Sequence, residues 1–596
     1  MEPKENKAIG RKPLSPLLLS LLSVLVGVVA GFGAVVFRGL IGLFHNLLFL
    51  GRFSFEYNAN VHTPASPWGP LVILVPVLGA VGVAFLVKNF APEARGHGVP
   101  EVIDAIYYNG GRIRPVVALI KSLASALSIG SGGSVGREGP IIQIGSSFGS
   151  SVGQMLRIPA WQRVVLIAGG AGAGIAATFN TPVGGVLFAL EIMMHEISVR
   201  TLVPVALATA AGTYIGRAFF GLYPSFVIPA LETPYYHLVN PVVLVSYVGL
   251  GLIMGVVSAL FIKSIYGAED FFQRRVGGSY YRQHLLGMFG VGLVLYGLMA
   301  TTGHYYIEGV GYATVQDILS GIALPWMLLV LLFALKLLVT SLTLGSGASG
   351  GIFSPALFLG ATLGDAYGMM LGWCFPGLNI SAPAFAVAGM AGVVGGATGA
   401  AMAAIVMIFE MTLDYNVIIP MTITVAVSYG IRKVLCRESI YTMKLERRGH
   451  FVPEAFHSSP HLVQPVSKIM LKDFGHLKVS DGLDEIERLM RNEPAPSVFL
   501  VEDGDRIVGV VRSEKILKAL SAGPFKAADI AERDYVTVSE HATLFDAVIV
   551  MRASMASAAL VMDETKPATV AANVKGLVAA SQLGDAMIEN SRLFLD

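Results

Sequence analysis

The chain has 596 residues, of which 54% are hydrophobic and 14% are charged, and its mean hydropathy is +0.66. Average soluble domains carry about 25% charged residues, so this composition excludes an ordinary soluble protein and indicates a polytopic membrane protein. The formal net charge of +2 favours no nucleic-acid partner. The two cysteines, Cys374 and Cys436, offer neither a disulfide framework nor a metal site.

The charges are concentrated at the C-terminal end of the chain. Residues 465–596 contain 15 Lys or Arg and 20 Asp or Glu, whereas the preceding 464 residues contain 27 and 20. This shift predicts an N-terminal segment at 1–15, a membrane domain at 16–445, a linker at 446–464 and a soluble, mildly acidic domain at 465–596.

The first apolar run, 17–37, is too long for the core of a signal peptide and long enough to span a bilayer. Four basic residues precede it: Lys4, Lys7, Arg11 and Lys12. The positive-inside rule therefore predicts a cytoplasmic N-terminus.

Further uncharged apolar runs follow at 164–190, 242–262, 366–409 and 416–431. The run at 366–409 is long enough to require more than one helix. Gly and Pro interrupt nearly all of these runs, and non-helical backbone at membrane depth is tolerated only inside protein or beside an aqueous cavity. The pattern predicts broken and tilted helices around a central pathway.

The chain contains an internal repeat. SGGSVGREGPIIQIG at 131–145 aligns with SGASGGIFSPALFLG at 346–360 at an offset of 215, and Lys121 and Lys336 share that offset. A second pair of blocks, 168–191 and 388–410, follows in the same order. We expect two related halves, at about 16–230 and 235–445. The alignment itself does not distinguish parallel from inverted repeats.

Three glycine-rich loops precede apolar helical stretches: GHGVPE at 96–101, GREGP at 136–140 and GIFSP at 351–355. Glycine permits tight turns, and free N–H groups at a helix start favour an anion without a neutralising cation. Paired interrupted segments in two repeats are typical of a transport site. The alternative is that these loops are ordinary breaks that allow helices to pack.

Glu138 is a carboxylate inside an otherwise uncharged stretch, where an ionisable group is expensive. When ionised, it can occupy the place of an anion, and when protonated it can leave that place. We therefore predict a gate or a proton-coupled element. The alternative is a salt bridge with the neighbouring Arg137.

The motifs GHGVPE, GSGGSVGREGP, FNTPVGGVLFALE and GGIFSP, with a late tyrosine at 441, closely resemble the CLC family of chloride channels and proton-coupled chloride transporters. The resemblance implies a dimeric all-α polytopic membrane protein with an inverted repeat of about eighteen helices, many tilted or broken, and one anion pathway per subunit. A soluble α/β pair of CBS domains would follow. It also implies that Glu138 is the gate and that the anion site includes His97, Gly98, Arg137, Gly139, Ile352, Phe353 and Tyr441.

Two positions depart from the family pattern. The first is His97, where the family usually has a serine facing the anion. A histidine can donate an N–H to chloride when neutral and carries a charge when protonated. We predict that transport or anion preference depends on pH through His97. The alternative is that the imidazole turns to a local partner and only the loop amides bind the anion.

The second departure is Ile192, where proton-coupled members often carry a glutamate that admits protons from the cytoplasm. Isoleucine cannot carry a proton, so the sequence favours channel-like chloride conduction. Proton-coupled antiport is the alternative, with His97, Glu196 or water as another route. Glu191 and Glu410 end equivalent apolar runs, which favours helix-end structural roles for both. For Lys121 and Lys336, we expect one to contribute positive potential to the pathway and the other to snorkel.

The C-terminal region contains its own repeat, at 465–522 and 523–596, and each copy predicts an amphipathic helix followed by two short strands. CBS pairs often bind adenine nucleotides through an acid, but Lys515 and Gln582 stand at those positions. We therefore expect no cofactor and a role in dimerisation or gating. Arg512 and Lys515 remain candidate phosphate contacts.

Other classes fit less well. An intramembrane enzyme needs a catalytic set such as HExxH, a cation transporter needs carboxylates along its path, and ATP-driven transport needs a GxxxxGK[ST] loop; the sequence has none of these patterns. We predict a chloride or other monovalent-anion transporter that is not an enzyme. Compact termini and few cysteines indicate a prokaryotic inner membrane, with the N-terminus and CBS pair in the cytoplasm.

Overall fold

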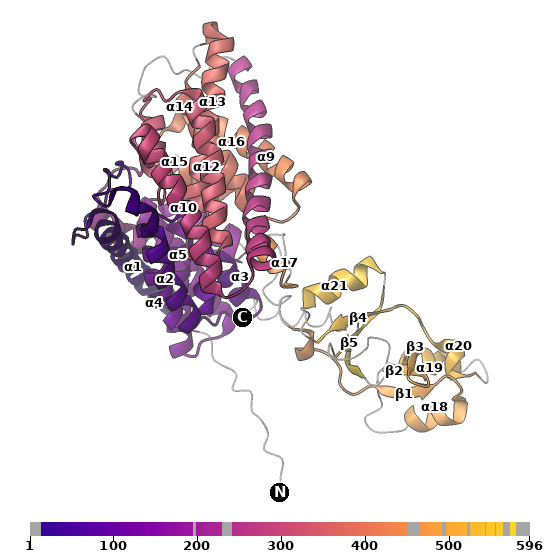
Figure 1. Cartoon of the computed structure of the whole chain (residues 1–596). Coiled ribbons are helices and arrows are strands. Elements are labelled where there is room, and N and C mark those ends of the chain that lie inside the picture. The colour runs from indigo at the N-terminus through magenta and orange to yellow at the C-terminus, as the bar shows by residue number, and fades with distance from the viewer. Residues whose placement is uncertain are drawn as a thin grey trace. The chain divides into compact units, whose positions relative to one another are not determined.

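The computed structural model divides the chain into two units, Met1–Phe456 and His457–Asp596 (Figure 1). The residues it describes are 14–194, 198–228, 241–378, 380–450, 452, 465–490, 496, 498–520, 525–540, 542, 544–554, 556–563 and 573–579. Most of the predicted linker at 446–464 therefore lies outside the described residues, as do Glu196 and Gln582.

The named secondary-structure elements in the described part of the first unit are all helices, joined by loops. Its first half contains α1 (Pro16–Leu50), α2 (Val75–Asn89), α3 (Val99–Tyr107), α4 (Val116–Gly130), α5 (Glu138–Met155), α6 (Ala160–Phe179), α7 (Pro182–Phe188) and α8 (Val199–Phe220). Its second half contains α9 (Pro241–Phe271), α10 (Tyr280–Thr302), α11 (Tyr312–Leu319), α12 (Trp326–Gly345), α13 (Phe353–Cys374), α14 (Ala382–Thr398), α15 (Ala401–Thr412), α16 (Ile418–Leu435) and α17 (Thr442–Glu446). A π-helical turn, η3 (Ala189–Met194), extends α7.

Eight of the described helical segments are long and apolar enough to cross a membrane: Pro16–Leu50, Gly69–Asn89, Ala160–Phe179, Val199–Phe220, Pro241–Val276, Tyr280–Thr302, Trp326–Gly345 and Tyr415–Leu435. Shorter apolar helices lie between them. The apolar run at 366–409 contains parts of α13, α14 and α15, which confirms that it holds more than one helix. The prediction of a membrane body with broken helices is therefore confirmed.

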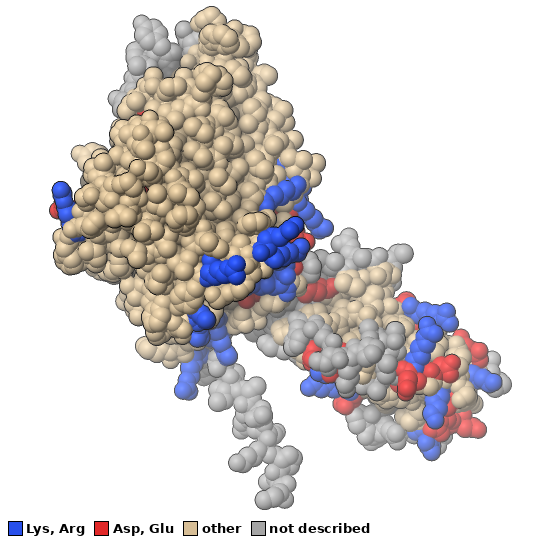
Figure 2. Space-filling view, in the orientation of Figure 1, with Lys and Arg blue, Asp and Glu red and all other residues tan. Residues whose placement is uncertain are grey.

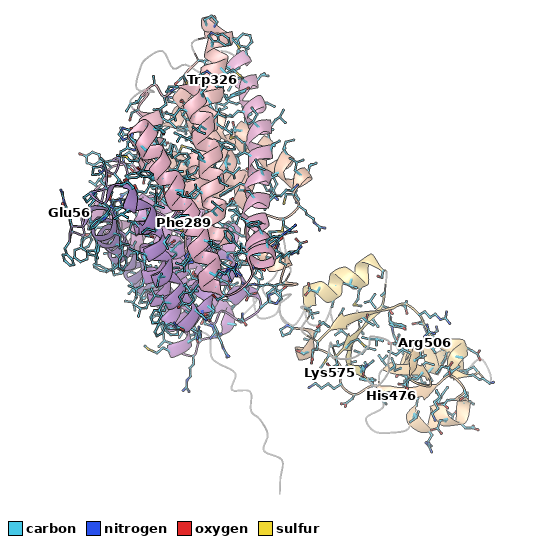
Figure 3. The ribbon with its side chains drawn as sticks, in the orientation of Figure 1. Glu56, Phe289, Trp326, His476, Arg506 and Lys575 are labelled. Atoms are coloured by element: carbon cyan, nitrogen blue, oxygen red, sulfur yellow. The ribbon has the colours of Figure 1, made fainter. Side chains whose placement is uncertain are left out.

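The outer surface of this unit suits a lipid environment. Figure 2 shows that uncharged residues cover most of its visible face and that Lys and Arg gather mainly at one end. Large apolar side chains point outward from its helices, such as Phe289 on α10 and Trp326 on α12, which are 43% and 57% exposed (Figure 3). Exposed apolar area of this extent is stable in a bilayer and costly in water.

Reciprocal contacts relate the two halves as expected for a two-fold axis. Gly136 and Gly351, which are equivalent in the repeat, each donate a backbone N–H to the carbonyl of the other, at 2.7 and 2.6 Å. Two further hydrogen bonds across the halves are related by the repeat, because Thr340 is equivalent to Ser125 and Ser349 to Ser134. They are Ser125 with Ser349 at 2.8 Å and Thr340 with Ser134 at 3.0 Å. The sequence repeat is thus a structural repeat whose halves meet at these loops.

Glu191 and Glu410 cap helices of the opposite half. The carboxylate of Glu410 accepts the N–H groups of Val183 and Gly184 at the start of α7, at 3.1 and 2.7 Å. The carboxylate of Glu191 accepts those of Met402 and Ala403 at the start of α15, at 3.3 and 2.8 Å. These contacts agree with the predicted helix-end roles, because a negative charge stabilises a helix N-terminus.

We expect Glu191→Gln and Glu410→Gln each to lower the stability of the protein by about 1 kcal/mol, because the amide removes the charge that stabilises the helix start. Thermal unfolding of the detergent-solubilised protein measures this effect. Glu446→Gln, at an exposed position of α17, is the control and should unfold like the unmodified protein. Equal unfolding temperatures for all three variants would contradict the capping role.

Close helix packing depends on glycine. A Cβ on Gly145 of α5 would lie 2.1 Å from the carbonyl oxygen of Gly170 on α6. The equivalent pair repeats the contact, since a Cβ on Gly360 of α13 would lie 2.3 Å from the oxygen of Gly389 on α14. Small residues at such crossings allow the backbones of membrane helices to approach. They also fix the positions of α5 and α13, which begin at the candidate site.

The second unit contains two three-stranded sheets of the same topology. The first sheet has the order β1-β2-β3 and consists of β1 (Gly475–Lys478), β2 (Val498–Asp503) and β3 (Arg506–Arg512). The second sheet has the order β4-β5-β6 and consists of β4 (Tyr535–Ser539), β5 (Ala558–Met562) and β6 (Val574–Ala579). In each sheet the first pair is parallel and the second antiparallel. The helices are α18 (Leu483–Met490), α19 (Ser513–Leu520), α20 (Ala527–Ile530) and α21 (Leu544–Ala553).

The predicted helix and two strands are present in both copies of this repeat, and a short strand additionally precedes each helix. These strands, β1 and β4, were not predicted, because β1 has four residues with alternating polarity and β4 is only partly buried. Each pairs in parallel with the next strand, and such a contact is not visible in local sequence.

Candidate anion pathway and gate

Each of the three glycine-rich loops leads into the start of a helix. Gly98 directly precedes α3 with a φ of 85°, which favours glycine at that position. Glu138 is the first residue of α5, and Ile352 directly precedes Phe353, the first residue of α13. The predicted anion-binding residues of these loops therefore lie at helix N-termini, where free N–H groups and the helix dipole favour negative charge.

The three loops form one cluster. The mutual backbone hydrogen bonds of Gly136 and Gly351 join the starts of α5 and α13. Gly96 joins the loop before α3 to this pair, since it donates to the carbonyl of Ala348 at 2.9 Å and accepts from Gly350 at 3.3 Å. Gly139 packs so closely that a Cβ there would lie 2.2 Å from the carbonyl oxygen of His97. Residues far apart in sequence thus meet at a single buried point.

Glu138 is 1% exposed and is held by donors from the second half of the chain. Its Oε1 accepts hydrogen bonds from the hydroxyl groups of Tyr312 and Ser354, each at 2.5 Å. Its Oε2 accepts from the backbone N–H of Ser354 at 3.3 Å. The carboxylate therefore occupies the start of α13, in the kind of position that a small anion would take.

Arg137 does not take up the alternative role of an ion-pair partner for Glu138. Its guanidinium lies over the rings of Phe179 and Tyr312, 5.5 and 5.3 Å from their centroids. Among the described residues its Nε has no hydrogen-bond partner. The positive charge is thus retained beside the gate, where it favours the approach of an anion.

His97 and Tyr441 lie together behind the gate. The two rings are 6.0 Å apart between centroids, and both side chains are buried, with His97 4% exposed. His97 Nε2 lies 3.3 Å from the hydroxyl of Tyr266 on α9, which donates to the carbonyl of Ile440 at 2.7 Å. The family resemblance predicts that His97 and Tyr441 share one site, and the structure places them side by side. The resemblance does not point to Tyr266.

Both repeat-related lysines are fully buried, so the expectation that one of them snorkels is wrong. Lys121 donates to the carbonyls of Ala94 and Gly96, at 3.0 and 2.7 Å. Lys336 donates to the equivalent carbonyls of Ile307 and Gly309, at 2.9 and 3.0 Å. Each ammonium satisfies two carbonyls, so the lysines fix the loops that precede α3 and α11.

A small polar pocket lies next to the residues that bind Glu138. Tyr312, whose hydroxyl binds Glu138, is part of its lining, together with Tyr57, His62 and Glu308. All four of these side chains carry polar groups, so the pocket suits water and ions better than lipid. The lining of the pocket thus includes a side chain that binds the Glu138 carboxylate.

Ion pairs attach the short helix α17 to α3. Glu101 of α3 pairs with Lys444 at 2.9 Å and with Arg448 at 2.6 Å. Burial alone would raise the pKa of Glu101, but these two cations lower it from 4.5 to about 2. Because α17 follows Tyr441 and α3 follows His97, the ion pairs hold the two sides of the candidate anion site together.

A carboxyl group whose pKa is lowered by folding stabilises the native state above its unfolded pKa, and this contribution is lost as the pH falls. We expect Glu101→Gln to reduce stability at neutral pH by about 3 kcal/mol, which is the shift converted at 1.36 kcal/mol per unit. Thermal unfolding measured from pH 7 downward should show the difference shrinking between pH 4.5 and pH 2. A difference that stayed constant with pH would contradict this account.

Comparisons with known proteins agree with this arrangement. The family model described as "Voltage gated chloride channel" matches residues 78–433, and the CBS domain model matches residues 466–522. The "H(+)/Cl(-) exchange transporter ClcA" of Yersinia pseudotuberculosis is 32% identical over 441 residues, covering 73% of this chain and 88% of the relative. The protein of the same name from Cronobacter sakazakii is 34% identical over 442 residues, covering 73% and 90%.

The chain belongs to the CLC family. A solved structure described as a slow cyanobacterial Cl-/H+ antiporter is 25% identical, with a TM-score of 0.63, and covers 73% of this chain and 99% of that one. A eukaryotic CLC transporter has the same fold, at 21% identity and a TM-score of 0.59, and covers 95% and 98%. The expected CLC fold with a CBS pair is thus confirmed, and the protein is an integral membrane transport protein and not an enzyme.

As a CLC protein, the chain departs from proton-coupled members at Ile192. This residue lies in η3, buried beside the capping Glu191. It carries no titratable group, and Glu196, the nearby acid considered as a substitute, lies outside the described residues. Position 192 therefore supplies no proton carrier to this CLC protein.

The site contains two gate residues that the sequence comparison did not single out, Tyr312 and Ser354. Gly98 and Gly311 directly precede α3 and α11, so this loop repeats at an offset of 213, and the residue equivalent to Tyr312 is Val99 rather than His97. Ser354 lies inside the predicted GIFSP loop, but only its backbone neighbours were expected to act. The repeat therefore offered no signal for Tyr312.

In the CBS pair, the candidate phosphate contacts are only partly available. Lys515 on α19 already pairs with Glu532 at 2.8 Å. Arg512 is the last residue of β3, and its side chain is partly buried. An ammonium paired with a carboxylate is a weaker phosphate ligand than a free one.

Proposed function

We propose that this CLC protein exchanges chloride for protons across a membrane, with Glu138 as the gate that alternates between an anion and a proton. The observation that carries the proposal is the position of the buried Glu138 carboxylate at the start of α13, bound by two hydroxyl groups and one backbone N–H. Hydrogen-bond donors in this geometry can bind either a carboxylate or a chloride ion. Protonation of Glu138 removes its charge and frees the place for the anion.

The alternative favoured by Ile192 alone was channel-like conduction. Two findings favour exchange instead. Relatives with 32–34% identity carry the name H(+)/Cl(-) exchange transporter, and the similar cyanobacterial structure is described as a Cl-/H+ antiporter. In addition, the start of α13 is held by a carboxyl group, a kind of side chain that can exchange a proton, which suits proton coupling.

The experiment is a reversal-potential measurement with purified protein in a planar bilayer. At a fixed chloride gradient, exchange predicts that the reversal potential shifts when a pH gradient is imposed, because protons contribute to the driving force. A channel predicts no shift. Replacement of chloride by nitrate, bromide or fluoride in the same bilayer determines which monovalent anions are carried.

The remaining assignments belong to the same proposal. We infer a homodimer with one pathway per subunit, a prokaryotic inner membrane as its location, and a cytoplasmic position for the N-terminus and the CBS pair. Mass measurement of the purified protein in detergent tests the dimer. Protease accessibility of a C-terminal tag in intact cells tests the orientation.

For the CBS pair we propose a supporting role in dimerisation or gating without an adenine-nucleotide cofactor. The pairing of Lys515 with Glu532 supports this role, since it occupies one of the two candidate phosphate contacts. Calorimetry of the full-length protein with ATP is the test. Binding in the low micromolar range would contradict the proposal.

A further inference from the structure

The hydrogen bonds around His97 determine which of its ring nitrogens carries the proton. The hydroxyl of Tyr266 has one hydrogen, and it donates this hydrogen to the carbonyl of Ile440 at 2.7 Å, because a carbonyl can only accept. Toward His97 Nε2, 3.3 Å away, the Tyr266 oxygen is therefore an acceptor. The neutral imidazole must carry its hydrogen on Nε2.

The other ring nitrogen, Nδ1, then presents a lone pair. It is buried and has no hydrogen-bond partner within the described part of the chain. A lone pair repels an anion and accepts a proton. Neutral His97 is thus a poor ligand for chloride, contrary to the expectation that a neutral imidazole donates an N–H to the ion.

The surroundings keep this imidazole neutral in the absence of an anion. The ring is buried between Tyr266 and Tyr441, and nearby cations oppose a positive charge on it. The charged groups that act on it are Lys121 from α4, Glu101 from α3, and Lys444 and Arg448 at and after α17. Three of these four groups are cationic. A chloride ion beside the ring supplies the negative charge that an imidazolium needs.

We propose that His97 is the inner proton carrier of the exchanger, taking up a proton on Nδ1 when an anion occupies the adjacent site. This inference rests on the proposed exchange function and supplies a carrier in place of the acid missing at Ile192. The step is a proton transfer from hydronium in the solution to the Nδ1 lone pair, and it yields water and an imidazolium paired with chloride. The backbone carbonyl of His97 packs against Gly139, so the loop that carries His97 contacts the start of the helix that carries Glu138.

The decisive test measures proton uptake on chloride binding in a protein whose gate cannot titrate. Calorimetry of full-length Glu138→Gln protein with sodium chloride, in buffers of different ionisation enthalpy, gives the number of protons taken up per ion. We expect about one proton, and a chloride affinity that falls about tenfold per pH unit in the range where His97 must be protonated on binding. With His97→Gln added, the amide still donates to Tyr266 but does not titrate. Uptake should vanish, and the affinity should become independent of pH.

Equal proton uptake with and without His97→Gln would overturn the proposal. Tyr266→Phe, also in the Glu138→Gln background, separates this role from a structural one. Without the acceptor on Nε2, the imidazole hydrogen can move to Nδ1 and donate to chloride, so proton uptake per ion should fall while affinity at high pH rises. A purely structural role of Tyr266 would lower affinity equally at every pH.

Transport separates failure of the inference from failure of the proposed function. In liposomes, the number of protons moved per chloride ion should fall at least tenfold in His97→Gln, whatever its rate of chloride transport. If the unmodified protein couples protons and His97→Gln retains the same coupling ratio, exchange stands and His97 is not the carrier. If the unmodified protein moves no protons at all, exchange itself fails, and the carrier role fails with it.

Discussion

Glu138→Gln is expected to abolish proton movement while chloride continues to flow. The amide has nearly the same shape as a protonated carboxyl group, so the pathway remains accessible to the anion, but it cannot release a proton. Loss of a positioned acid or base typically reduces proton transfer by about 100-fold or more. Proton flux in liposomes driven by a chloride gradient should therefore fall to the background, and the reversal potential should no longer respond to a pH gradient.

Glu308→Gln is the matched control for this substitution. Glu308 is a partly buried acid in the lining of the same pocket as Tyr312, but it pairs with His45 at 2.9 Å, whereas Glu138 is bound by Tyr312 and Ser354. Its variant should keep proton coupling. Coupling that survives in Glu138→Gln, or disappears equally in both variants, would show that Glu138 is not the proton-exchanging gate.

The sequence repeat predicted more than the existence of two halves. The offset of 215 residues holds from Lys121 to Gly145. A contact made by a residue of one half is therefore expected again in the other half, between the equivalent residues. The structure shows this for the two lysines, for the paired glycines and for the hydrogen bonds of Ser125 and Thr340. Repetition of this kind is readable from sequence, since a common offset implies a common local fold.

Side-chain partners between distant segments could not be predicted in this way. Glu138 and Tyr312 are 174 residues apart, and no periodicity links them. The lysines were expected to behave differently from each other because a long aliphatic chain suits snorkelling, yet each finds two backbone carbonyls in its own loop. Paired lysines at the repeat offset were better interpreted as equivalent structural residues.

The inference from Ile192 shows a different limit. A single substitution at a family position removes one proton carrier but does not exclude a carrier elsewhere. Within the described part of the chain, the buried Nδ1 of His97 has no hydrogen-bond partner. The tautomer of His97 depends on Tyr266 and Ile440, which are 169 and 343 residues away in sequence. Only the three-dimensional arrangement reveals that Nδ1 is available.

Tyr312→Phe is expected to increase the apparent affinity for chloride wherever the gate is ionised. The ionised Glu138 competes with chloride for the start of α13, and the Tyr312 hydroxyl stabilises the carboxylate in that place at 2.5 Å. A hydrogen bond to a charged group contributes about 1.5–3 kcal/mol, which corresponds to a factor of about 10 to 100 in the competition. Calorimetric titration of the purified protein with chloride at alkaline pH measures this change.

The same substitution in the Glu138→Gln background is the control. With no charged carboxylate to stabilise, Tyr312→Phe should change chloride affinity by less than about threefold, which is the usual range of additivity for independent effects. The double-mutant cycle thus isolates the energy that the hydroxyl contributes to holding the gate closed. If Tyr312→Phe weakened chloride binding in both backgrounds, the hydroxyl would be a ligand of the anion. The competition between Glu138 and chloride would then depend on Ser354 and the amides of α13 alone.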